Sequence, residues 1–195
     1  MESHFEPVTI SFPDLRYVFL DRDGVINRKA PEGSYVWSWK DFFILPGVES
    51  AIALLNRSGR HVIVVSNQRG VALGLYTRMD VEALHRRLEI HLADFGAHVD
   101  AYYYCPHDEN QCNCRKPKIG LFEQAFRDFP EASPSNSIVI GDSLCDIEAA
   151  HRLHLPSIFI LGDPSTTKSG SQQAIASASL VSNSLIDVVR QYFGK

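Results

Sequence analysis

Short hydrophobic runs alternate along this chain with segments in which hydrophobic residues recur at helical spacing. The runs at 17–20 and 61–65 are hydrophobic at almost every position, which is typical of parallel strands buried on both faces. Between them, Val48, Ile52 and Leu55 recur at intervals of four and three residues, as on the buried face of a helix. The pattern therefore predicts a strand, a helix and a second strand in succession.

The same alternation continues toward the end of the chain. Thr77 is expected to cap a helix with a hydrophobic stripe from Val81 to Leu92, and Gly96 follows its last turn. The segment 162–179 is rich in Ser, Thr, Gly and Ala and is expected to be a surface loop. Further strands are expected at 99–104, 137–140, 157–161 and 180–181, and further helices at 119–129, 144–153 and 185–192. Such alternation predicts an α/β fold with a central parallel sheet and helices on both faces.

Length and composition are those of one enzyme-sized domain, residues 1–195. The 195 residues can form a core without disulfides. No hydrophobic run approaches the roughly 20 residues of a membrane span, and the first residues lack the features of a signal peptide. We therefore expect a cytoplasmic protein with reduced cysteines, and a monomer. A net charge of −4 argues against bulk nucleic acid or an anionic membrane as partner.

Carboxylates follow two of the predicted strands. Asp21 and Asp23 come directly after the first strand, and Asp142 follows the strand at 137–140. Ligands of open parallel sheets bind outside the carboxyl ends of the strands, so these side chains are expected to lie close together. One such aspartate alone is more often a helix cap or a turn residue. The set, however, would repel itself without a cation, and oxygen ligands suit Mg²⁺, so we predict a magnesium site.

Four potential metal ligands of another kind lie within ten residues of one another. They have the spacing C-x-H-x4-C-x-C and are Cys105, His107, Cys112 and Cys114. Three thiolates and one imidazole suit tetrahedral Zn²⁺, and a site filled by protein ligands is structural rather than catalytic. We predict a zinc loop at about 105–114 that positions the adjacent cations Arg115 and Lys116. The remaining cysteine, Cys145, is expected to be a core residue.

Four motifs resemble, in order, those of haloacid dehalogenase-like (HAD) phosphatases: FLDRDGVIN at 19–27, VVSNQ at 64–68, RKP at 115–117 and GDSLCD at 141–146. The resemblance extends from Tyr17 to Leu161 and implies a Rossmann-like HAD fold. In that superfamily the first aspartate of the DxD motif attacks phosphorus and the second is the acid and base. These residues would be Asp21, which would form an aspartyl-phosphate, and Asp23.

The resemblance also implies how the metal and the phosphate are bound. The Mg²⁺ ligands would be the Asp21 carboxylate, the Asp23 backbone carbonyl and Asp142. Asp146 would orient Lys116 or a metal-bound water. The groups that bind phosphate oxygens would be Ser66, the Asn67 backbone and Lys116, with Arg115 beside them.

The loop CPH...CNCRKP resembles a zinc-loop branch of the superfamily that acts on D-glycero-D-manno-heptose 1,7-bisphosphate or on histidinol phosphate. These enzymes lack a large cap domain, which agrees with the length of this chain. The run SNQRGVALGLYT at 66–77 is closer to the heptose enzymes. The segment 32–36 lies where those enzymes contact the sugar, so Tyr35 is a further candidate for substrate binding. The expected reaction is removal of the C7 phosphate from the heptose bisphosphate, a small sugar phosphate.

Two alternatives remain open from the sequence. Ser143 stands where the heptose enzymes usually carry a lysine, and the zinc loop has the shorter length of the histidinol-phosphate type, so histidinol phosphate is the alternative substrate. A zinc-binding interaction module without catalysis is an alternative of another class. Asp108 and Glu109, which lie between the ligand pairs, disfavour a nucleic-acid-binding module of this kind.

Overall fold

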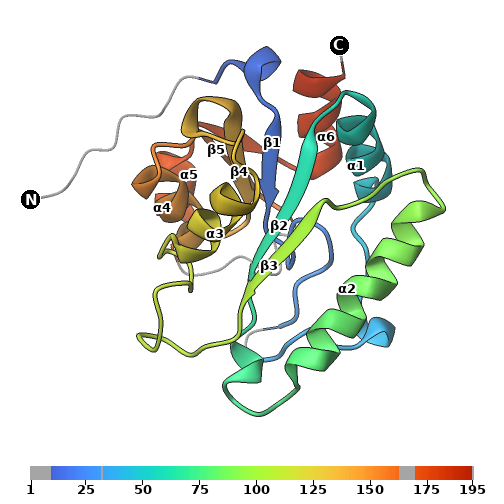
Figure 1. The fold of residues 1–195 in the computed structure, drawn as a ribbon, viewed down its shortest axis with the longest axis vertical. Coiled ribbons are helices and arrows are strands. Elements are labelled where there is room, and N and C mark those ends of the chain that lie inside the picture. Colours follow the sequence, from blue (N-terminus) through green and yellow to red (C-terminus); the bar gives the residue numbers. More distant parts are fainter. Residues whose placement is uncertain (1–9, 32, 163–169, 195) are drawn as a thin grey trace, which may run out of the picture.

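A parallel sheet of six strands, in the order β3-β2-β1-β4-β5-β6, forms the centre of the protein (Figure 1). The structure is a computed structural model that describes residues 10–31, 33–162 and 170–194. The strands are Tyr17–Leu20 (β1), His61–Asn67 (β2), Ala101–Cys105 (β3), Ser137–Gly141 (β4), Ser157–Ile160 (β5) and Leu180–Ser182 (β6). At the end of the central strand, Leu20 pairs with Val64 of β2 on one side and with Ile140 of β4 on the other.

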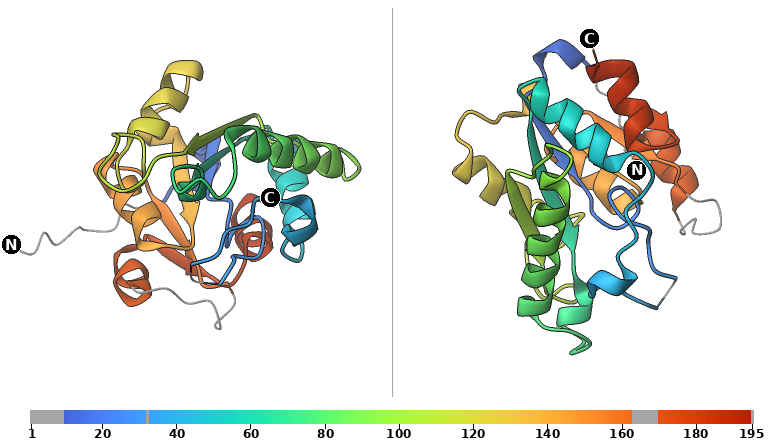
Figure 2. Two further views of the ribbon diagram at one scale, coloured as in Figure 1. Left: turned by 90° about the horizontal axis from the view of Figure 1, so that it is seen from below. Right: turned by 90° about the vertical axis from the view of Figure 1, so that its right-hand side faces the viewer.

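Helices cover both faces of the sheet, as Figures 1 and 2 show. They are Val48–Arg57 (α1), Arg78–Ala93 (α2), Gly120–Asp128 (α3), Leu144–Arg152 (α4), Ser171–Ser177 (α5) and Leu185–Val188 (α6). Successive strand residues point to opposite faces, so Val18 and Leu20 share a core with α1, α2 and α6, whereas Phe19 packs with α3 and α4. This arrangement confirms the predicted α/β fold.

The longest helix, α2, begins and packs as its sequence predicts. Thr77 Oγ1 accepts a hydrogen bond from the Asp80 backbone N–H at 3.2 Å, and the Asp80 carboxylate accepts one from the Thr77 N–H at 2.8 Å. This capping box satisfies two backbone donors at the start of the helix. The predicted hydrophobic stripe is buried, and its members are Val81, Leu84, Leu88 and Leu92.

The loops that follow β1 to β4 leave the same edge of the sheet, because all of these strands are parallel. The longest of them covers residues 21–47 and contains a short 3-10 turn, Trp39–Asp41. Backbone bridges from Asn27 to Asp23 and to Ile44 hold this loop together near its two ends. The described part of the loop brings Lys29 and Tyr35 to the pocket at the carboxyl ends of the strands.

The C-terminal part differs from its prediction in two ways. The expected surface loop at 162–179 contains the helix α5 in its described portion, and Ala174 of this helix is completely buried with Ile147 and Phe159. The composition of small residues concealed the helix, because Ser171 and Ala174 form a narrow buried face without large side chains. The expected helix 185–192 is the short α6 followed by a π-helical turn, Val189–Phe193.

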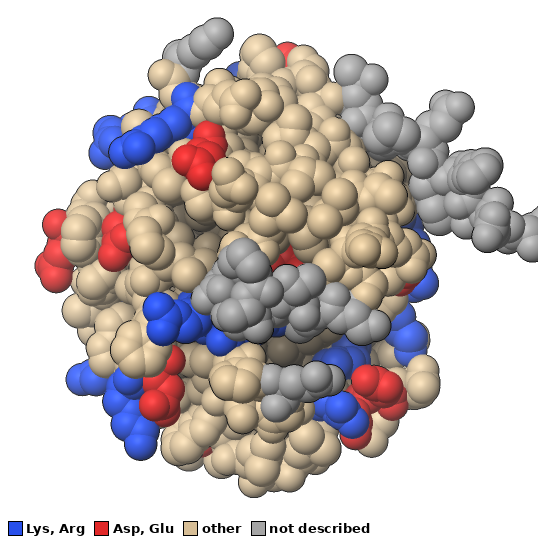
Figure 3. Space-filling view, turned by 180° about the vertical axis from the view of Figure 1, so that it is seen from behind, with Lys and Arg blue, Asp and Glu red and all other residues tan. Residues whose placement is uncertain are grey.

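The described surface carries charges of both signs. On the face shown in Figure 3, Lys and Arg groups lie next to Asp and Glu groups and do not form one continuous basic stripe over the described residues. No helix in the described segments has the length and hydrophobicity needed to cross a membrane.

The buried face of α5 can be tested with a pair of substitutions. Ala174→Asp places a carboxylate among buried hydrophobic side chains and is expected to lower the free energy of unfolding by at least about 2 kcal/mol. Ala176 is exposed on the same helix, so Ala176→Asp is expected to cost less than about 1 kcal/mol. Urea unfolding followed by circular dichroism measures both values. Equal, small effects would show that the segment is not packed as described.

Candidate active site

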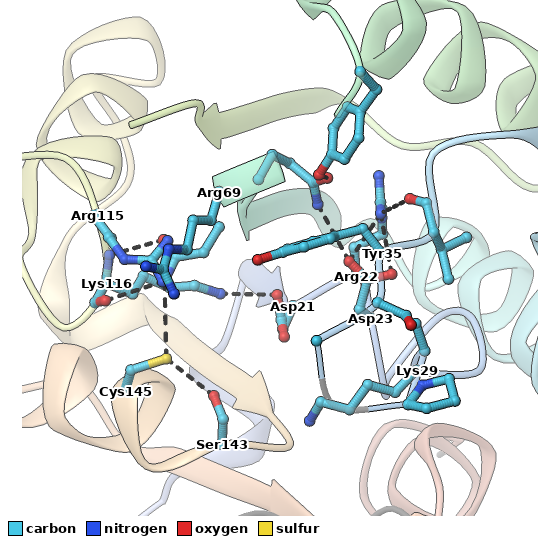
Figure 4. A pocket seen from close by; sticks show the side chains of 18 residues that line it. Asp21, Arg22, Asp23, Lys29, Tyr35, Arg69, Arg115, Lys116, Ser143 and Cys145 are labelled. Carbon is cyan, nitrogen blue, oxygen red and sulfur yellow. Dashed lines mark hydrogen bonds and ion pairs between the residues drawn. The ribbon is translucent and has the colours of Figure 1, made fainter. Parts of the chain in front are cut away.

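A polar pocket of about 290 Å³ lies at the carboxyl edge of the sheet. The ends of β1 and β2, the loop 21–47, the residues after Cys114 and the start of α4 all contribute to its wall. Figure 4 shows Lys29 and Tyr35 entering it from one side and Arg115 and Lys116 from the other, with Asp21 between them. Of the predicted catalytic and phosphate-binding residues, the pocket thus gathers Asp21, Asp23, Asn67, Arg115 and Lys116, which come from three separate motifs.

Lys116 is the buried cation at the base of this pocket. Its Nζ lies 2.9 Å from Asp21 Oδ1 and 2.6 Å from Asp146 Oδ1, and it donates to the Val65 carbonyl at 2.5 Å. Burial by itself lowers the pKa of Lys116, but the Asp146 and Asp21 carboxylates outweigh this effect and raise the pKa above its ordinary value. Lys116 is therefore a permanent positive charge beside Asp21, and the prediction that Asp146 orients it agrees with this geometry.

The two oxygens of the Asp146 carboxylate bind different partners, which explains its spacing from Ser143. One carboxylate oxygen, Oδ2, accepts hydrogen bonds from the backbone N–H and the hydroxyl of Ser143, which form a capping box at the start of α4. The other oxygen, Oδ1, pairs with Lys116. The three-residue spacing of a capping box therefore places a carboxylate where it can also bind the lysine.

Three carboxylates form a possible metal site. Oxygen atoms of Asp21, Asp142 and Asp146 lie within 4.8 Å of one another, and a set of oxygen donors suits Mg²⁺. Gly24 makes room for this cluster, because a Cβ at its position (φ +104°) would lie 2.1 Å from Asp142 Oδ2. Lys29, from the loop 21–47, forms an ion pair with Asp142.

Asp23 lines the same pocket, but its carboxylate points to a different set of partners. It accepts hydrogen bonds from Arg22 Nη2, at 3.0 and 2.8 Å, from Asn27 Nδ2 at 2.8 Å and from Gln68 Nε2 at 3.2 Å. The Asp23 side chain thus lines the same pocket as Asp21 and is oriented by donors from two segments of the chain.

Asn67 and Ser66, both at the end of β2, have different positions. The Asn67 side chain bridges to the backbone of Lys116, accepting from its N–H at 3.0 Å and donating to its carbonyl at 3.1 Å. It therefore holds the residue that carries the buried cation. The Ser66 hydroxyl is buried behind the pocket wall and accepts a 2.6 Å hydrogen bond from Gln68.

The four predicted zinc ligands converge on one point. Cys114 Sγ lies 3.2 Å from Cys105 Sγ, 3.3 Å from Cys112 Sγ and 3.3 Å from His107 Nδ1. All the cysteines are free thiols. Burial raises the pKa of Cys105 and of Cys114. Burial also acts to raise that of Cys112, but hydrogen bonds from Cys114 and the Arg115 backbone outweigh it and lower the pKa to about 6. The cluster can hold a metal ion by its geometry and its donor types.

The loop that carries this cluster is also fixed to the sheet and to the loop after β2. Its first predicted ligand, Cys105, pairs with Asn67 across the two strands. Arg69 lines the pocket and binds Asp108 of the predicted zinc loop, with Nε 2.5 Å from Oδ1. Arg115 follows the last ligand directly, and its Nη1 is buried without a hydrogen-bond partner in the described part of the chain. Arg115 also lines the pocket, so it remains a candidate to bind an anion there.

Sequence reasoning missed several residues of this site. Arg22, Gln68 and Arg69 are direct neighbours of predicted site residues, and their place at strand ends was the available signal. Lys29 had no signal, because only the path of the long loop brings it to the carboxylates. Cys145 was expected in the core, but it lines the pocket wall, with Sγ 3.1 Å from the Ser143 hydroxyl. Burial raises the pKa of Cys145 to about 12, so it stays a neutral thiol.

Comparison with known proteins identifies the family of this site. A family model described as polynucleotide kinase 3 phosphatase matches residues 18–169. The D-glycero-alpha-D-manno-heptose-1,7-bisphosphate 7-phosphatase of Mycobacterium bovis is 45% identical over 137 residues, which are 70% of this chain and 72% of that protein. The D-glycero-beta-D-manno-heptose-1,7-bisphosphate 7-phosphatase of Vibrio cholerae is 36% identical over 179 residues, 88% of this chain and 92% of that protein.

Solved structures show the same relationship. The D,D-heptose 1,7-bisphosphate phosphatase from B. bronchiseptica, complexed with magnesium and phosphate, superposes with a TM-score of 0.81 at 28% identity and covers 92% of this chain and 98% of its own. A HAD-like phosphatase from Mesorhizobium loti superposes with a TM-score of 0.63 at 28% identity, covering 82% of this chain and 76% of its own. The chain is therefore a HAD-superfamily phosphatase and belongs to the same family as the heptose-1,7-bisphosphate 7-phosphatases.

Proposed function

We propose that this phosphatase removes the C7 phosphate of D-glycero-D-manno-heptose 1,7-bisphosphate through an aspartyl-phosphate on Asp21, with Mg²⁺ as cofactor. The observation that carries the chemistry is the position of Asp21, which lies in a polar pocket, contacts the buried cation Lys116 and lies close to the carboxylates of Asp142 and Asp146. The substrate is inferred from the heptose-bisphosphate phosphatases that this chain resembles.

The first step is attack on phosphorus by a carboxylate oxygen of Asp21. The new Asp21 O–P bond forms as the bond from phosphorus to the sugar oxygen breaks, and Asp23 donates its proton to that departing oxygen. In the second step Asp23 takes a proton from a water that attacks the aspartyl-phosphate, which releases inorganic phosphate and restores Asp21. Bound Mg²⁺, held by Asp21, Asp142 and the Asp23 backbone carbonyl, would offset the negative charge of the phosphoryl oxygens.

Charge around the phosphate comes from the chain itself. A phosphoryl group in transfer is stabilised mainly by positioned cations and hydrogen-bond donors. Lys116 lies next to Asp21 and would contact the transferred phosphoryl group. Arg115, with its unpartnered nitrogen in the described structure, would bind either that group or a second phosphate on the sugar. Tyr35 from the opposite wall would contact the sugar.

Zinc is the metal that we propose for the Cys105, His107, Cys112 and Cys114 cluster. Its four soft or borderline donors form a complete tetrahedral set, so its role would be structural. The loop that they close carries Arg115 and Lys116, and a metal here would therefore fix both cations over Asp21. The alternative of a zinc module without catalysis is not retained, because the chain is a phosphatase.

Asp21→Asn is expected to reduce phosphate release by at least about 10⁴-fold, because an amide cannot attack phosphorus. Steady-state phosphate release measures the loss, and circular dichroism confirms that the variant is folded. Asp94→Asn, an exposed residue at the end of α2, is the matched control. Activity above about a tenth of the unsubstituted protein would exclude the covalent role of Asp21.

The substrate is tested with heptose 1,7-bisphosphate, heptose 7-phosphate and histidinol phosphate. We expect kcat/KM for the bisphosphate to exceed that for histidinol phosphate by at least about tenfold. The reason is that the side of the pocket with Arg115 and Lys116 is positively charged and attracts a second phosphate. If Arg115 binds the second phosphate, Arg115→Met lowers kcat/KM for the bisphosphate by about 10- to 100-fold, and that for the 7-phosphate by much less. A higher kcat/KM for histidinol phosphate would contradict the heptose substrate and favour histidinol phosphate instead.

Removal of one thiolate tests the zinc site. Cys112→Ser is expected to lower zinc content below half an equivalent and to lower the melting temperature by several degrees, because a structural metal stabilises only the folded loop. Elemental analysis and thermal unfolding measure these quantities. Cys145→Ser removes a cysteine outside the cluster and serves as the control for zinc content. A zinc content that is unchanged by Cys112→Ser would contradict the ligand assignment.

A further inference from the structure

The environment of Asp23 links the proposed proton-transfer group to a neighbouring loop. Besides Asn27, which belongs to its own loop, two side chains donate to the carboxylate: Arg22 and Gln68. Both are almost completely buried, with 1% and 2% of their surface exposed, whereas the Asp23 side chain is 24% exposed toward the pocket. Buried side chains therefore bind one side of the Asp23 carboxylate, and its exposed side is accessible to a substrate in the pocket.

Arg22 joins Asp23 to residues 35–37 of the loop 21–47 through a single nitrogen. Its Nη2 donates to both oxygens of Asp23 and also to the Val36 carbonyl at 2.7 Å. The other guanidinium nitrogens, Nε and Nη1, have no hydrogen-bond partner in the described part of the protein. The ring of Phe42 lies 5.8 Å from the guanidinium carbon. A displacement of Val36 would thus be transmitted directly to the group that binds Asp23.

Gln68 makes a second, independent link to the same loop. Its Nε2 donates to Asp23 and to the Ser66 hydroxyl, and its Oε1 accepts a 2.9 Å hydrogen bond from the Tyr76 hydroxyl. These three bonds determine the orientation of the amide, because its nitrogen can only donate and its oxygen can only accept.

Tyr76 connects this amide to the loop through its aromatic ring. The ring is buried and stacks on Trp37 at 6.3 Å with an interplanar angle of 11°, and it also contacts the ring of Tyr35 at 6.1 Å. Gly70 is required for this position, because a Cβ there would lie 2.1 Å from the Tyr76 ring. Residues 35–37 are thus connected to Asp23 by a backbone carbonyl through Arg22 and by two aromatic rings through Tyr76 and Gln68.

We propose that Gln68, oriented by Tyr76, is a positioning residue that connects residues 35–37, the part of the loop proposed to face the sugar, to proton transfer by Asp23. The inference rests on the proposed function, in which Asp23 protonates the departing oxygen. A sugar that contacts Tyr35 would then orient, through these links, the Asp23 carboxyl that protonates its departing oxygen. The arrangement suits phosphate esters of aliphatic alcohols, because their alkoxide leaves only when it receives a proton as the P–O bond breaks.

The test compares two leaving groups. Aryl phosphates such as p-nitrophenyl phosphate release a stable phenolate without a proton, whereas a sugar phosphate depends on the acid. The measured quantity is the ratio of kcat/KM for heptose 1,7-bisphosphate to that for p-nitrophenyl phosphate. A loss of fold or of metal lowers both values together and leaves the ratio unchanged, so the ratio reports the position of the acid.

Gln68→Met keeps the volume of the side chain and removes its three hydrogen bonds. We expect it to lower the ratio by at least about tenfold, a part of the roughly 10²- to 10⁴-fold loss expected for Asp23→Asn. Tyr76→Phe, which removes one hydroxyl and keeps the stacked ring, is expected to lower the ratio by a smaller factor of about three. It keeps the inference testable if Gln68→Met does not fold. Gln124→Met, on the exposed surface of α3, is the matched control.

Two failures can be told apart. If Asp23→Asn lowers the ratio but neither Gln68→Met nor Tyr76→Phe does, the positioning role is wrong and the acid assignment stands. If Asp23→Asn itself leaves the ratio unchanged, the acid role of Asp23 is wrong, and the positioning role that depends on it is overturned as well.

Discussion

The buried ion pairs of Lys116 with Asp21 and Asp146 are the interaction on which the rest of this active site depends. They join the end of β1, the start of α4 and the loop after the cysteine cluster, three segments that are far apart in the sequence. Two carboxylates brought this close would repel each other in a mostly buried place. The ammonium of Lys116 offsets this repulsion, and the same cation remains next to the position of the proposed phosphoryl group.

The protein places this cation by several short-range constraints rather than by one strong contact. The Asn67 amide binds the Lys116 backbone from the end of β2. The Val65 carbonyl accepts from its ammonium, and Asp146 is itself fixed by the capping box of α4. A proposed zinc ion would close the loop immediately before it. Removing any one of these contacts would leave the buried Lys116 ammonium less well compensated. This would lower the stability of the folded protein, because a buried charge is poorly solvated by water.

The two aspartates of the first motif have different surroundings although only Arg22 separates them. Asp21 points to Lys116 and lies near the carboxylates of Asp142 and Asp146, and Asp23 points to neutral amides and to the guanidinium of Arg22. In an extended strand, residues two apart would share a face, but β1 ends at Leu20 and the chain bends at Arg22, so the two carboxylates reach different partners. A nucleophile and a proton-transfer group can thus lie two residues apart without competing for the same partners.

Local patterns in the sequence predicted the layers of the fold and most of the candidate site residues. Buried strands without polar residues, helices with one hydrophobic stripe, and aspartates at strand ends are local patterns, so Asp21, Asp142 and the Cys105–Cys114 ligands could be selected before any contact was known. Tertiary structure alone decided the positions of Lys29 and Cys145 in the pocket, the helix α5 in a segment of small residues, and the links from Val36 and Tyr76 to Asp23. The physical reason is the range of the interaction: spacing along the chain predicts which residues share a face or a cap, but contacts between distant loops depend on how those loops pack.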